Sequence, residues 1–213
     1  MTSAPANKMK SARVKLSRKL IVEKALSIVR GEGLNALTMR RVATDLNTGA
    51  MSLYRHVSDR DDLLLSMMDH VATGIEQPTK QSDHRAEILA IMLTLHRTFR
   101  DDPWVVNVLL FEGRGSLKIL PLLERLFSAL AQLGCDTRLA IEYYSLLINY
   151  AYGENLSHQT KTERWRAQED LNGQTFADYP STKEVFEAER VSFEETFERN
   201  IKRIIEGIKP NAR

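Results

Sequence analysis

The chain has 213 residues, of which 43% are hydrophobic and 27% charged, and its formal net charge at pH 7 is +2. This length suffices for one or two domains with a buried core, and the composition excludes a disordered or fibrous chain. No apolar run approaches the roughly 20 residues of a membrane-spanning helix, so we expect a cytoplasmic protein with no membrane partner. The single cysteine cannot form an internal disulfide, and no residues at metal-ligand spacing predict a metal site or another cofactor.

Positive charge is concentrated near the N-terminus. Residues 1–60 contain 12 Lys and Arg against 4 Asp and Glu, whereas the rest of the chain contains 18 against 24. This asymmetry indicates that the first part meets an anionic partner, with phosphate as the first candidate. A solvated basic face is the alternative explanation.

The sequence up to residue 33 predicts an arm and one helix. Residues 1–16 are mainly small, polar and basic, which is typical of a flexible arm. From Ser17, a favourable N-cap, apolar residues recur at helical spacing, and Gly31 and Gly33 end this helix.

Two short helices separated by a tight turn follow. Thr38 is a favourable N-cap for the first, whose apolar residues lie three and four positions apart. Asn47 and Thr48 break this helix, and Asn tolerates the left-handed conformation that a tight turn needs. The second helix is expected over 49–57. Together they have the pattern of a helix-turn-helix at about 38–57.

The rest of the chain is also helical in pattern, so the expected fold class is all-α. Ser58 or Asp59 caps a long fourth helix that extends to about residue 73, and the polar segment 77–83 predicts a linker and a candidate domain boundary. Further helical patterns cover 85–100, 103–113, 117–134, 137–156 and 183–208. Pro121 is expected to break or bend the third of these.

Side chains of the helix-turn-helix divide into an inward and an outward set. Val42, Ala43 and Leu46 are expected to pack the first of these two helices against the rest of the domain. Leu53 and Val57, four residues apart, are expected to hold the second helix at a fixed angle. The outward set on that helix is Ala50, Met51, Ser52, Tyr54 and Arg55. Small residues let the backbone approach a DNA groove, hydroxyl groups bind phosphate, and Arg reaches phosphate or guanine.

Two segments carry a resemblance to a known family: LSRKLIVEKALSIVRGEGLNALTMRRVATDL and MSLYRHVSDRDDLL. Over residues 17–68 the chain resembles the DNA-binding domain of the tetracycline-repressor (TetR) family. The remainder resembles the family's regulatory domain more loosely, through DDPWVV, LERLFSALAQLG and FERNIKRIIEGI. The resemblance implies a three-helix helix-turn-helix domain over 17–60, joined through the fourth helix to a larger ligand-binding and dimerisation domain over 61–213.

The resemblance also implies a set of DNA-binding residues. They are Thr38, Arg40, Arg41, Thr48, Gly49, Ala50, Met51, Ser52, Tyr54, Arg55, His56 and Arg60. Thr38 and Arg40 would contact the DNA backbone. Tyr54 and His56 would bind phosphates, as would Arg60 at the start of the fourth helix. Residues 50–52 would face base edges.

Three features within and next to this set bear on how DNA is read. Asn47 stands where the family usually has Gly. Ala50 and Met51 have no hydrogen-bonding side chains, so direct readout there would rest on apolar contact with a thymine methyl. Arg55 occupies a position that is often aromatic in the family, and either phosphate or a base is within its reach. The arm residues 8–15 either add phosphate or minor-groove contacts or have no role.

The family resemblance further implies a homodimer. In the family the interface is a four-helix bundle from the last two long helices, here 137–156 and 183–208. The expected interface residues are Leu139, Leu146, Leu147, Tyr150, Phe193, Phe197, Ile201 and Ile204. Core packing within one chain is the competing use of these residues. A two-fold dimer with recognition helices about 34–36 Å apart predicts a palindromic operator.

The helices between about 59 and 133 are expected to enclose a pocket for a mostly apolar small molecule. The candidate ligand-binding residues are Met92, His96, Trp104, Phe111, Tyr143 and Tyr144. The same residue types also form ordinary protein cores. A bound ligand would move the fourth helix and so change the separation of the two recognition helices.

The sequence therefore predicts a bacterial, ligand-responsive transcriptional regulator: a homodimeric repressor released from a palindromic operator on double-stranded DNA by a small molecule. An effector-free DNA-binding dimer and an activator of the same fold are the alternatives. An all-α enzyme is the remote one, because no nucleophile elbow, phosphate-binding glycine loop or zinc signature is present.

Overall fold

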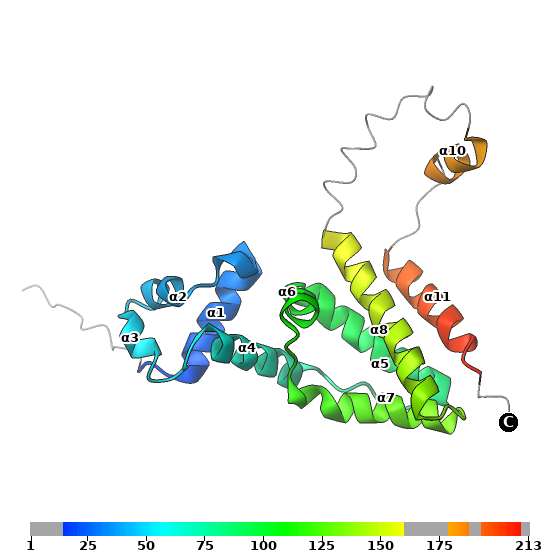
Figure 1. The fold of residues 1–213 in the computed structure, drawn as a ribbon, viewed down its shortest axis with the longest axis horizontal. Helices are drawn as coiled ribbons and strands as arrows, with labels where there is room; N and C mark the ends of the chain where they lie inside the picture. Colours follow the sequence, from blue (N-terminus) through cyan, green and yellow to red (C-terminus); the bar gives the residue numbers. More distant parts are fainter. Residues whose placement is uncertain (1–14, 160–178, 188–192, 210–213) are drawn as a thin grey trace, which may run out of the picture. The chain divides into compact units, whose positions relative to one another are not determined.

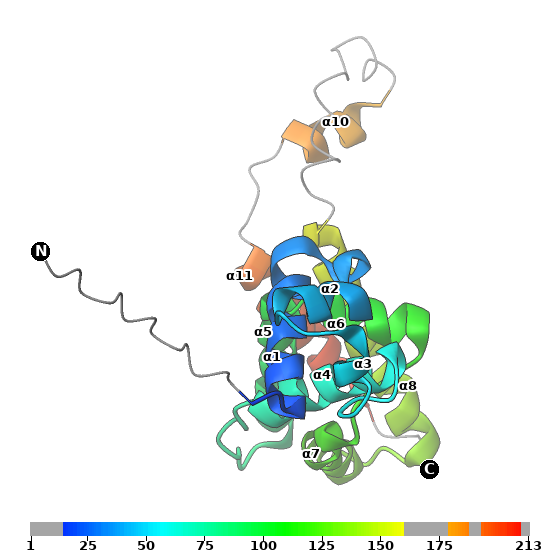
Figure 2. The same cartoon turned by 90° about the vertical axis from the view of Figure 1, so that its left-hand side faces the viewer.

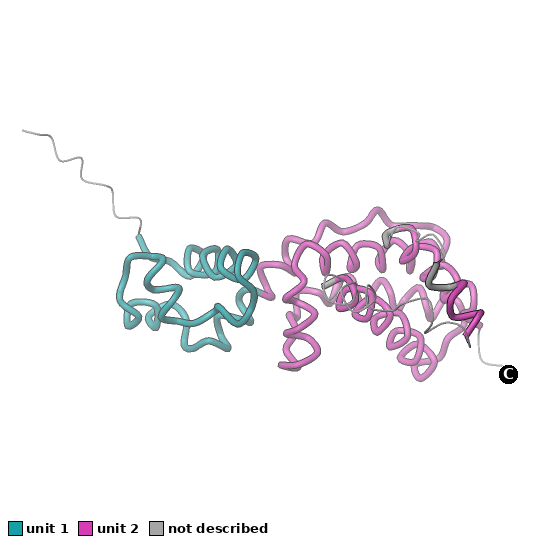
Figure 3. Tube along the Cα trace, turned by 90° about the horizontal axis from the view of Figure 1, so that it is seen from above, with its two compact units in different colours: residues 1–67 teal, residues 68–213 magenta. Residues whose placement is uncertain are grey.

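A computed structural model describes residues 15–159, 179–187 and 193–209 of the chain (Figure 1). All regular secondary structure in these ranges is helical, which confirms the predicted all-α class. The chain forms two compact units, residues 1–67 and 68–213 (Figure 3). The units meet within one helix, so the expected boundary at 77–83 was misplaced: this segment lies inside the second unit.

The first unit holds the helix-turn-helix, which is turned toward the viewer in Figure 2. Its elements are α1 (Arg18–Glu32), the 3-10 turn η1 (Leu34–Ala36), α2 (Met39–Asp45), α3 (Ala50–Leu53) and the first part of α4 (Arg60–Gly74). Helix α2 packs against both α1 and α3. The apolar residues of these helices therefore meet in one small core.

Helices α1, α2 and α4 each begin at a residue whose side chain caps the helix. The Ser17 hydroxyl accepts a hydrogen bond from the Leu20 amide at 3.3 Å. The Thr38 hydroxyl accepts one from the Arg41 amide at 3.1 Å. For α4 the cap is Asp59, whose carboxylate accepts from the Asp62 amide at 2.8 Å. Such caps satisfy backbone donors that have no partner inside the helix, and the predicted caps are confirmed.

The turn between α2 and α3 depends on Asn47. Its φ of 51° is the only positive value at a non-glycine position in the described ranges. Asn adopts this left-handed conformation more readily than other side chains do, as the sequence predicted. The turn closes when the Thr48 amide donates to the Ala43 carbonyl at 3.0 Å.

Helix α3 is shorter than predicted. It ends at Leu53 rather than Val57, and residues 54–56 form a turn. The amides of His56 and Val57 both donate to the Leu53 carbonyl, at 2.8 and 3.0 Å, so the helical ladder stops there. The cap of α4 begins two residues after Val57, which leaves no room for another helical turn.

The second unit is built around one central helix. Its elements are the rest of α4, α5 (His84–Asp101), α6 (Trp104–Asn107), the π-helical η2 (Val108–Glu112), the 3-10 turn η3 (Leu117–Ile119), α7 (Leu120–Gln132), α8 (Thr137–Gln159), α10 (Pro180–Glu187) and α11 (Phe193–Glu206). Helix α5 packs against α7, α8 and α11 (Figure 1). Burial of Ile88, Ile91 and Met92 on α5 follows from this position.

Several predicted helices of this unit differ in detail. The segment expected as one helix over 103–113 changes from α to π geometry at Val108 and ends at Gly113, which has a φ of 62°. Pro121 does not bend α7 but lies in its first turn, where a missing amide proton costs nothing. The helix expected over 183–208 is described as α10 and α11, and residues 188–192 between them lie outside the described ranges. No helix in the described ranges is long and apolar enough to cross a membrane.

A buried ion pair fastens the linker between α4 and α5. Arg125 on α7 donates to the Glu87 carboxylate at 2.7 Å and to the Pro78 carbonyl at 2.9 Å. The other Glu87 oxygen accepts from the Gln81 amide at 2.8 Å. The Arg125 hydrogen bond is the main cause that lowers the pKa of the Glu87 carboxyl. The segment 77–81 is thus held against α5 and α7.

We predict that Glu87→Gln lowers the free energy of unfolding of the second unit by about 3 kcal/mol, because it leaves the Arg125 charge without its carboxylate. Tryptophan fluorescence during urea unfolding measures this, since both tryptophans follow residue 67. The pKa of Glu87 is lower in the folded than in the unfolded chain. Its stabilising contribution is therefore present above about pH 4.3 and is lost as the pH falls through the folded value, so the gap between the two proteins narrows in acid.

Glu198→Gln is the matched control. Glu198 pairs with Lys202 on the surface of α11, where an ion pair contributes less than about 1 kcal/mol. Equal losses of stability in the two variants would contradict the role given to Glu87.

Candidate nucleic-acid interface and ligand cavity

The residues that the helix-turn-helix buries on its inner face determine which side chains are exposed on its outer face. Leu53 and Val57 are almost fully buried, as predicted, and so are Val42 and Ala43. Met51, on the opposite side of α3, is therefore 79% exposed. A single exposed apolar side chain is common on protein surfaces, so Met51 bears on a DNA interface only together with the polar side chains around it.

Three polar side chains on this face have no partner among the residues that the structure describes. Arg40, Tyr54 and Arg55 are exposed, and none makes a side-chain hydrogen bond or ion pair with the part of the chain that the structure describes. Thr38 is also exposed and caps α2. The guanidinium groups of Arg40 and Arg55 and the hydroxyl of Tyr54 are thus available to an external ligand.

The other predicted interface residues lie around this face. Thr48, Ala50, Ser52, His56 and Arg60 are half-buried, and Gly49 is exposed as the N-cap of α3. A Cβ added at Gly49 would meet nothing within 4 Å, and its φ is −78°, so the backbone does not require glycine there. The small side chains over 48–50 leave the start of α3 open to approach.

Arg41 differs from its neighbour Arg40. Its guanidinium donates to both Glu32 oxygens, at 2.7 and 2.9 Å, and to Asp45 at 3.0 Å. These two carboxylates raise the pKa of Arg41, with the Glu32 hydrogen bond as the largest cause. Arg41 was predicted at the interface, but its side chain ties α2 to the end of α1.

Arg18 is a residue that the sequence reasoning missed. It donates to the His56 carbonyl at 2.8 Å, to the Ser66 hydroxyl at 2.6 Å and to both oxygens of the Asp62 carboxylate. The hydrogen bond from Arg18 is the main cause that lowers the pKa of Asp62. Arg18 therefore joins α1 to α4 and to the end of the 54–56 turn. One signal was present: a cation in the first turn of a helix opposes the helix dipole and needs a partner.

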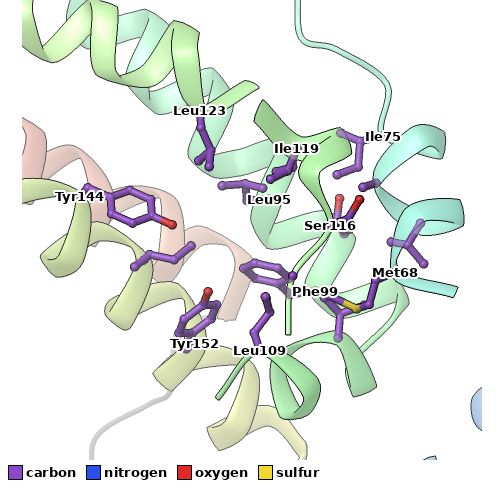
Figure 4. Close-up of a pocket in the computed structure, with 16 residues that line it drawn as sticks. Met68, Ile75, Leu95, Phe99, Leu109, Ser116, Ile119, Leu123, Tyr144 and Tyr152 are labelled. Carbon is purple, nitrogen blue, oxygen red and sulfur yellow. The ribbon is translucent and has the colours of Figure 1, made fainter. Parts of the chain in front are cut away.

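A cavity of about 100 Å³ lies within the second unit (Figure 4). Its walls come from the end of α4, from α5, from the segment between α6 and α7, and from α7 and α8. The apolar lining includes Met68, Ile75, Leu95, Phe99, Leu109 and Ile148. A mainly apolar lining with a few polar groups is typical of small-molecule sites.

Four hydroxyl groups supply the polar lining of the cavity. Ser116 donates to Asp69 at 2.5 Å, and Thr98 donates to the Thr94 carbonyl at 3.0 Å. Tyr144 and Tyr152 point into the cavity in Figure 4. Burial raises the pKa of Tyr144, and it raises that of Tyr152 to about 12, so both phenols are neutral near pH 7.

Only one of the predicted ligand residues lines this cavity, and that is Tyr144. Met92 is fully buried in the core around α5. His96 stacks on Phe197 with ring centroids 3.7 Å apart. Both side chains thus serve the packing of α5.

The remaining predicted ligand residues are used elsewhere. Trp104 donates its indole proton to Asp102 at 2.8 Å. Phe111 is 76% exposed on η2. Tyr143 donates to the Gly207 carbonyl and accepts from the Lys209 amide, both at 3.1 Å. The sequence could not show which apolar and aromatic residues line the cavity, because the same residue types also form the core.

The predicted dimer residues also divide. Leu147, Phe197 and Ile201 are fully buried within the chain, which is the competing use the sequence left open. Leu146 is 51% exposed on α8. Leu139, Tyr150 and Ile204 are half-buried, and the side chain of Phe193 lies outside the described residues.

Comparison with known proteins decides the family. Residues 77–211 match the family model described as "Tetracyclin repressor-like, C-terminal domain". The chain belongs to the TetR family. The predicted family and the predicted class of DNA-binding transcriptional regulator are therefore confirmed, and the TetR family is not a class of enzymes.

Relatives in the TetR family support this from both sequence and structure. An HTH-type transcriptional regulator of Saccharopolyspora erythraea is 26% identical over 207 residues, covering 92% of this chain and 86% of its own. The repressor DrrR1 of Streptomyces coeruleorubidus is 41% identical over 90 residues, covering 41% of this chain and 33% of its own. Apo ActR of Streptomyces coelicolor is 27% identical, with a TM-score of 0.74 over 92% of this chain and 96% of that one. ActR is also known in complex with actinorhodin, at 26% identity, a TM-score of 0.73 and the same coverage.

We predict that Arg18→Met loosens the end of the helix-turn-helix. Loss of its hydrogen bonds to His56, Asp62 and Ser66 is expected to speed amide hydrogen exchange at 56–66 about fivefold, which corresponds to roughly 1 kcal/mol of local stability. Lys19→Met is the matched control, because within the described ranges Lys19 pairs with Glu23 alone, one turn away on the exposed side of α1. Unchanged exchange at 56–66 in Arg18→Met would show that the contacts do not hold this segment.

Proposed function

We propose that the chain is a homodimeric repressor that binds a palindromic operator through the outer face of α2 and α3. A small molecule in the cavity of the second unit releases it from DNA. The observation that carries the proposal is the exposed set of Arg40, Met51, Tyr54 and Arg55, whose helices are held by buried residues. As a DNA-binding regulator it would act in the cytoplasm.

The chemistry of this face suits duplex DNA. Arg40 and the Tyr54 hydroxyl supply phosphate contacts, which fix the position of a helix on the duplex. Met51 is the apolar group that extends furthest from α3, and it suits contact with a thymine methyl. Arg55 reaches either phosphate or a base. The half-buried Ser52, the other small residues over 48–50, and Thr38, His56 and Arg60 complete the proposed interface, and Arg41 is left out.

A dimer would present two such faces. Helix α8 carries two exposed apolar side chains, Ile141 and Leu146, which are candidates for burial against a second copy. In a two-fold dimer the recognition helices meet successive major grooves about 34–36 Å apart. That geometry is the reason for a palindromic operator.

In this proposal, helix α4 couples ligand binding in the cavity to DNA binding by the first unit. The first residues of α4 belong to the first unit. The cavity of the second unit is lined by Met68, Val71 and Ala72 near the end of α4, and by Ile75 just after it. A ligand that favours one position of α4 would shift the population of DNA-binding states. The structure of ActR in complex with actinorhodin supports a regulator that responds to a small molecule. A coupling of about 1–3 kcal/mol changes operator affinity about 5- to 150-fold.

We predict that Arg40→Ala and Tyr54→Ala weaken binding to every DNA sequence, because each removes a phosphate contact. Arg40→Ala is also expected to lower the slope of log affinity against log salt by about 0.9, since one counterion fewer is released. Fluorescence anisotropy of a labelled duplex at several salt concentrations measures both quantities.

Arg41→Ala serves as the control in this experiment. It removes the same charge one position away, but from a side chain held by Glu32 and Asp45, so the salt slope is expected to stay close to that of the wild type. The assignment of the interface fails if both Arg40→Ala and Tyr54→Ala bind DNA with wild-type affinity.

A further inference from the structure

We infer that the cavity selects an uncharged, mainly apolar ligand whose hydroxyl or carbonyl group meets the hydroxyls of Tyr144 and Tyr152. This inference rests on the proposed function, because it gives the chemical class of the effector. It adds Tyr152 to the predicted Tyr144 as a residue that determines specificity.

The walls of the cavity exclude a charged ligand. Among the residues that the structure describes, none that lines it is Lys, Arg, His, Asp or Glu. An ion that enters such a site loses its hydration and gains no counter-charge, which strongly disfavours binding. Methyl, methylene and aromatic groups lose nothing by the same transfer and are drawn in by the hydrophobic effect.

The polar groups of the cavity are not equally available. The hydroxyls of Thr98 and Ser116 already donate to a carbonyl and a carboxylate of the protein. The hydroxyls of Tyr144 and Tyr152 make no hydrogen bond with any residue in the described ranges. A ligand oxygen placed against them would give each phenol proton an acceptor.

The spacing on α8 brings the two phenols together. Tyr144, Ile148 and Tyr152 lie four residues apart and thus on one face of the helix. Figure 4 shows both hydroxyls directed into the cavity, with Phe99 and Leu109 nearby. Both phenols are protonated near pH 7, and burial raises their pKa further above neutral, so each can donate a hydrogen bond to a ligand oxygen.

One charged group, Asp69, lies behind the wall of the cavity. Asp69 does not line the cavity, and its carboxylate accepts a hydrogen bond from Ser116, which does. This negative charge further disfavours an anionic ligand. It also makes a cationic ligand the main competing class, so the test includes one.

The test measures binding of four matched probes to the full chain at about pH 7: naphthalene, 2-naphthol, 2-naphthoate and 2-naphthylmethylammonium. 2-Naphthol is expected to bind about five- to tenfold more tightly than naphthalene through its hydrogen bonds. Both charged probes are expected to bind at least about tenfold more weakly than 2-naphthol. Calorimetric or fluorescence titration gives the four dissociation constants.

Variants of the two phenols test the assignment of residues. Tyr144→Phe and Tyr152→Phe are each expected to reduce the advantage of 2-naphthol and leave the affinity for naphthalene unchanged, whereas a misfolded variant would lose both. Tyr143→Phe is the matched control, because its hydroxyl bonds to Gly207 and Lys209 outside the cavity. It is expected to retain the full advantage.

Three results would overturn the inference: a charged probe that binds as tightly as 2-naphthol, an advantage of 2-naphthol that survives in the double Phe variant, or no binding by any probe. A different result would contradict the proposed function without contradicting this inference. If 2-naphthol binds with the expected selectivity but leaves DNA affinity unchanged in a mobility-shift titration, the ligand class stands and the proposed release from DNA does not.

Discussion

Burial of Leu53 and Val57 is the constraint on which the proposed DNA interface depends. These two side chains, four residues apart, fix the rotation of α3 about its own axis, so Met51, Tyr54 and Arg55 have to face outward. A helix of four residues has little stability of its own, and packing supplies what propensity cannot. The left-handed turn at Asn47 and the contacts of Arg18 with His56 and Asp62 hold the two ends of this segment.

The second unit is held together by apolar packing around the cavity and by an ion pair at its linker. Its cavity is an apolar space in a helical bundle, and its linker is held by the buried pair of Glu87 and Arg125. Helix α4 takes part in both units, since Asp62 binds Arg18 in the first and Met68 lines the cavity in the second. In the proposed mechanism a ligand in the cavity acts on the DNA-binding unit through this one helix.

The sequence predicted the features that local chemistry determines. The caps at Ser17 and Thr38, an α4 cap at Ser58 or Asp59 and the turn at Asn47 all follow from local chemistry. The burial of Leu53 and Val57 follows from their spacing of four residues, and the family motif lies in the same region. Features that depend on distant residues were missed. Arg41 resembles Arg40 in sequence but meets Glu32, nine positions away, and the cavity is formed by helices whose apolar residues look alike until they are packed.

The most direct test of the account is selection of bound duplexes from a random DNA pool by the full chain. The account predicts an enriched palindrome whose half-site centres lie about one helical turn apart, roughly 10 base pairs, or a multiple of that, because two symmetric recognition helices read it. Absence of any enriched sequence, or enrichment of a single site without two-fold symmetry, would contradict it.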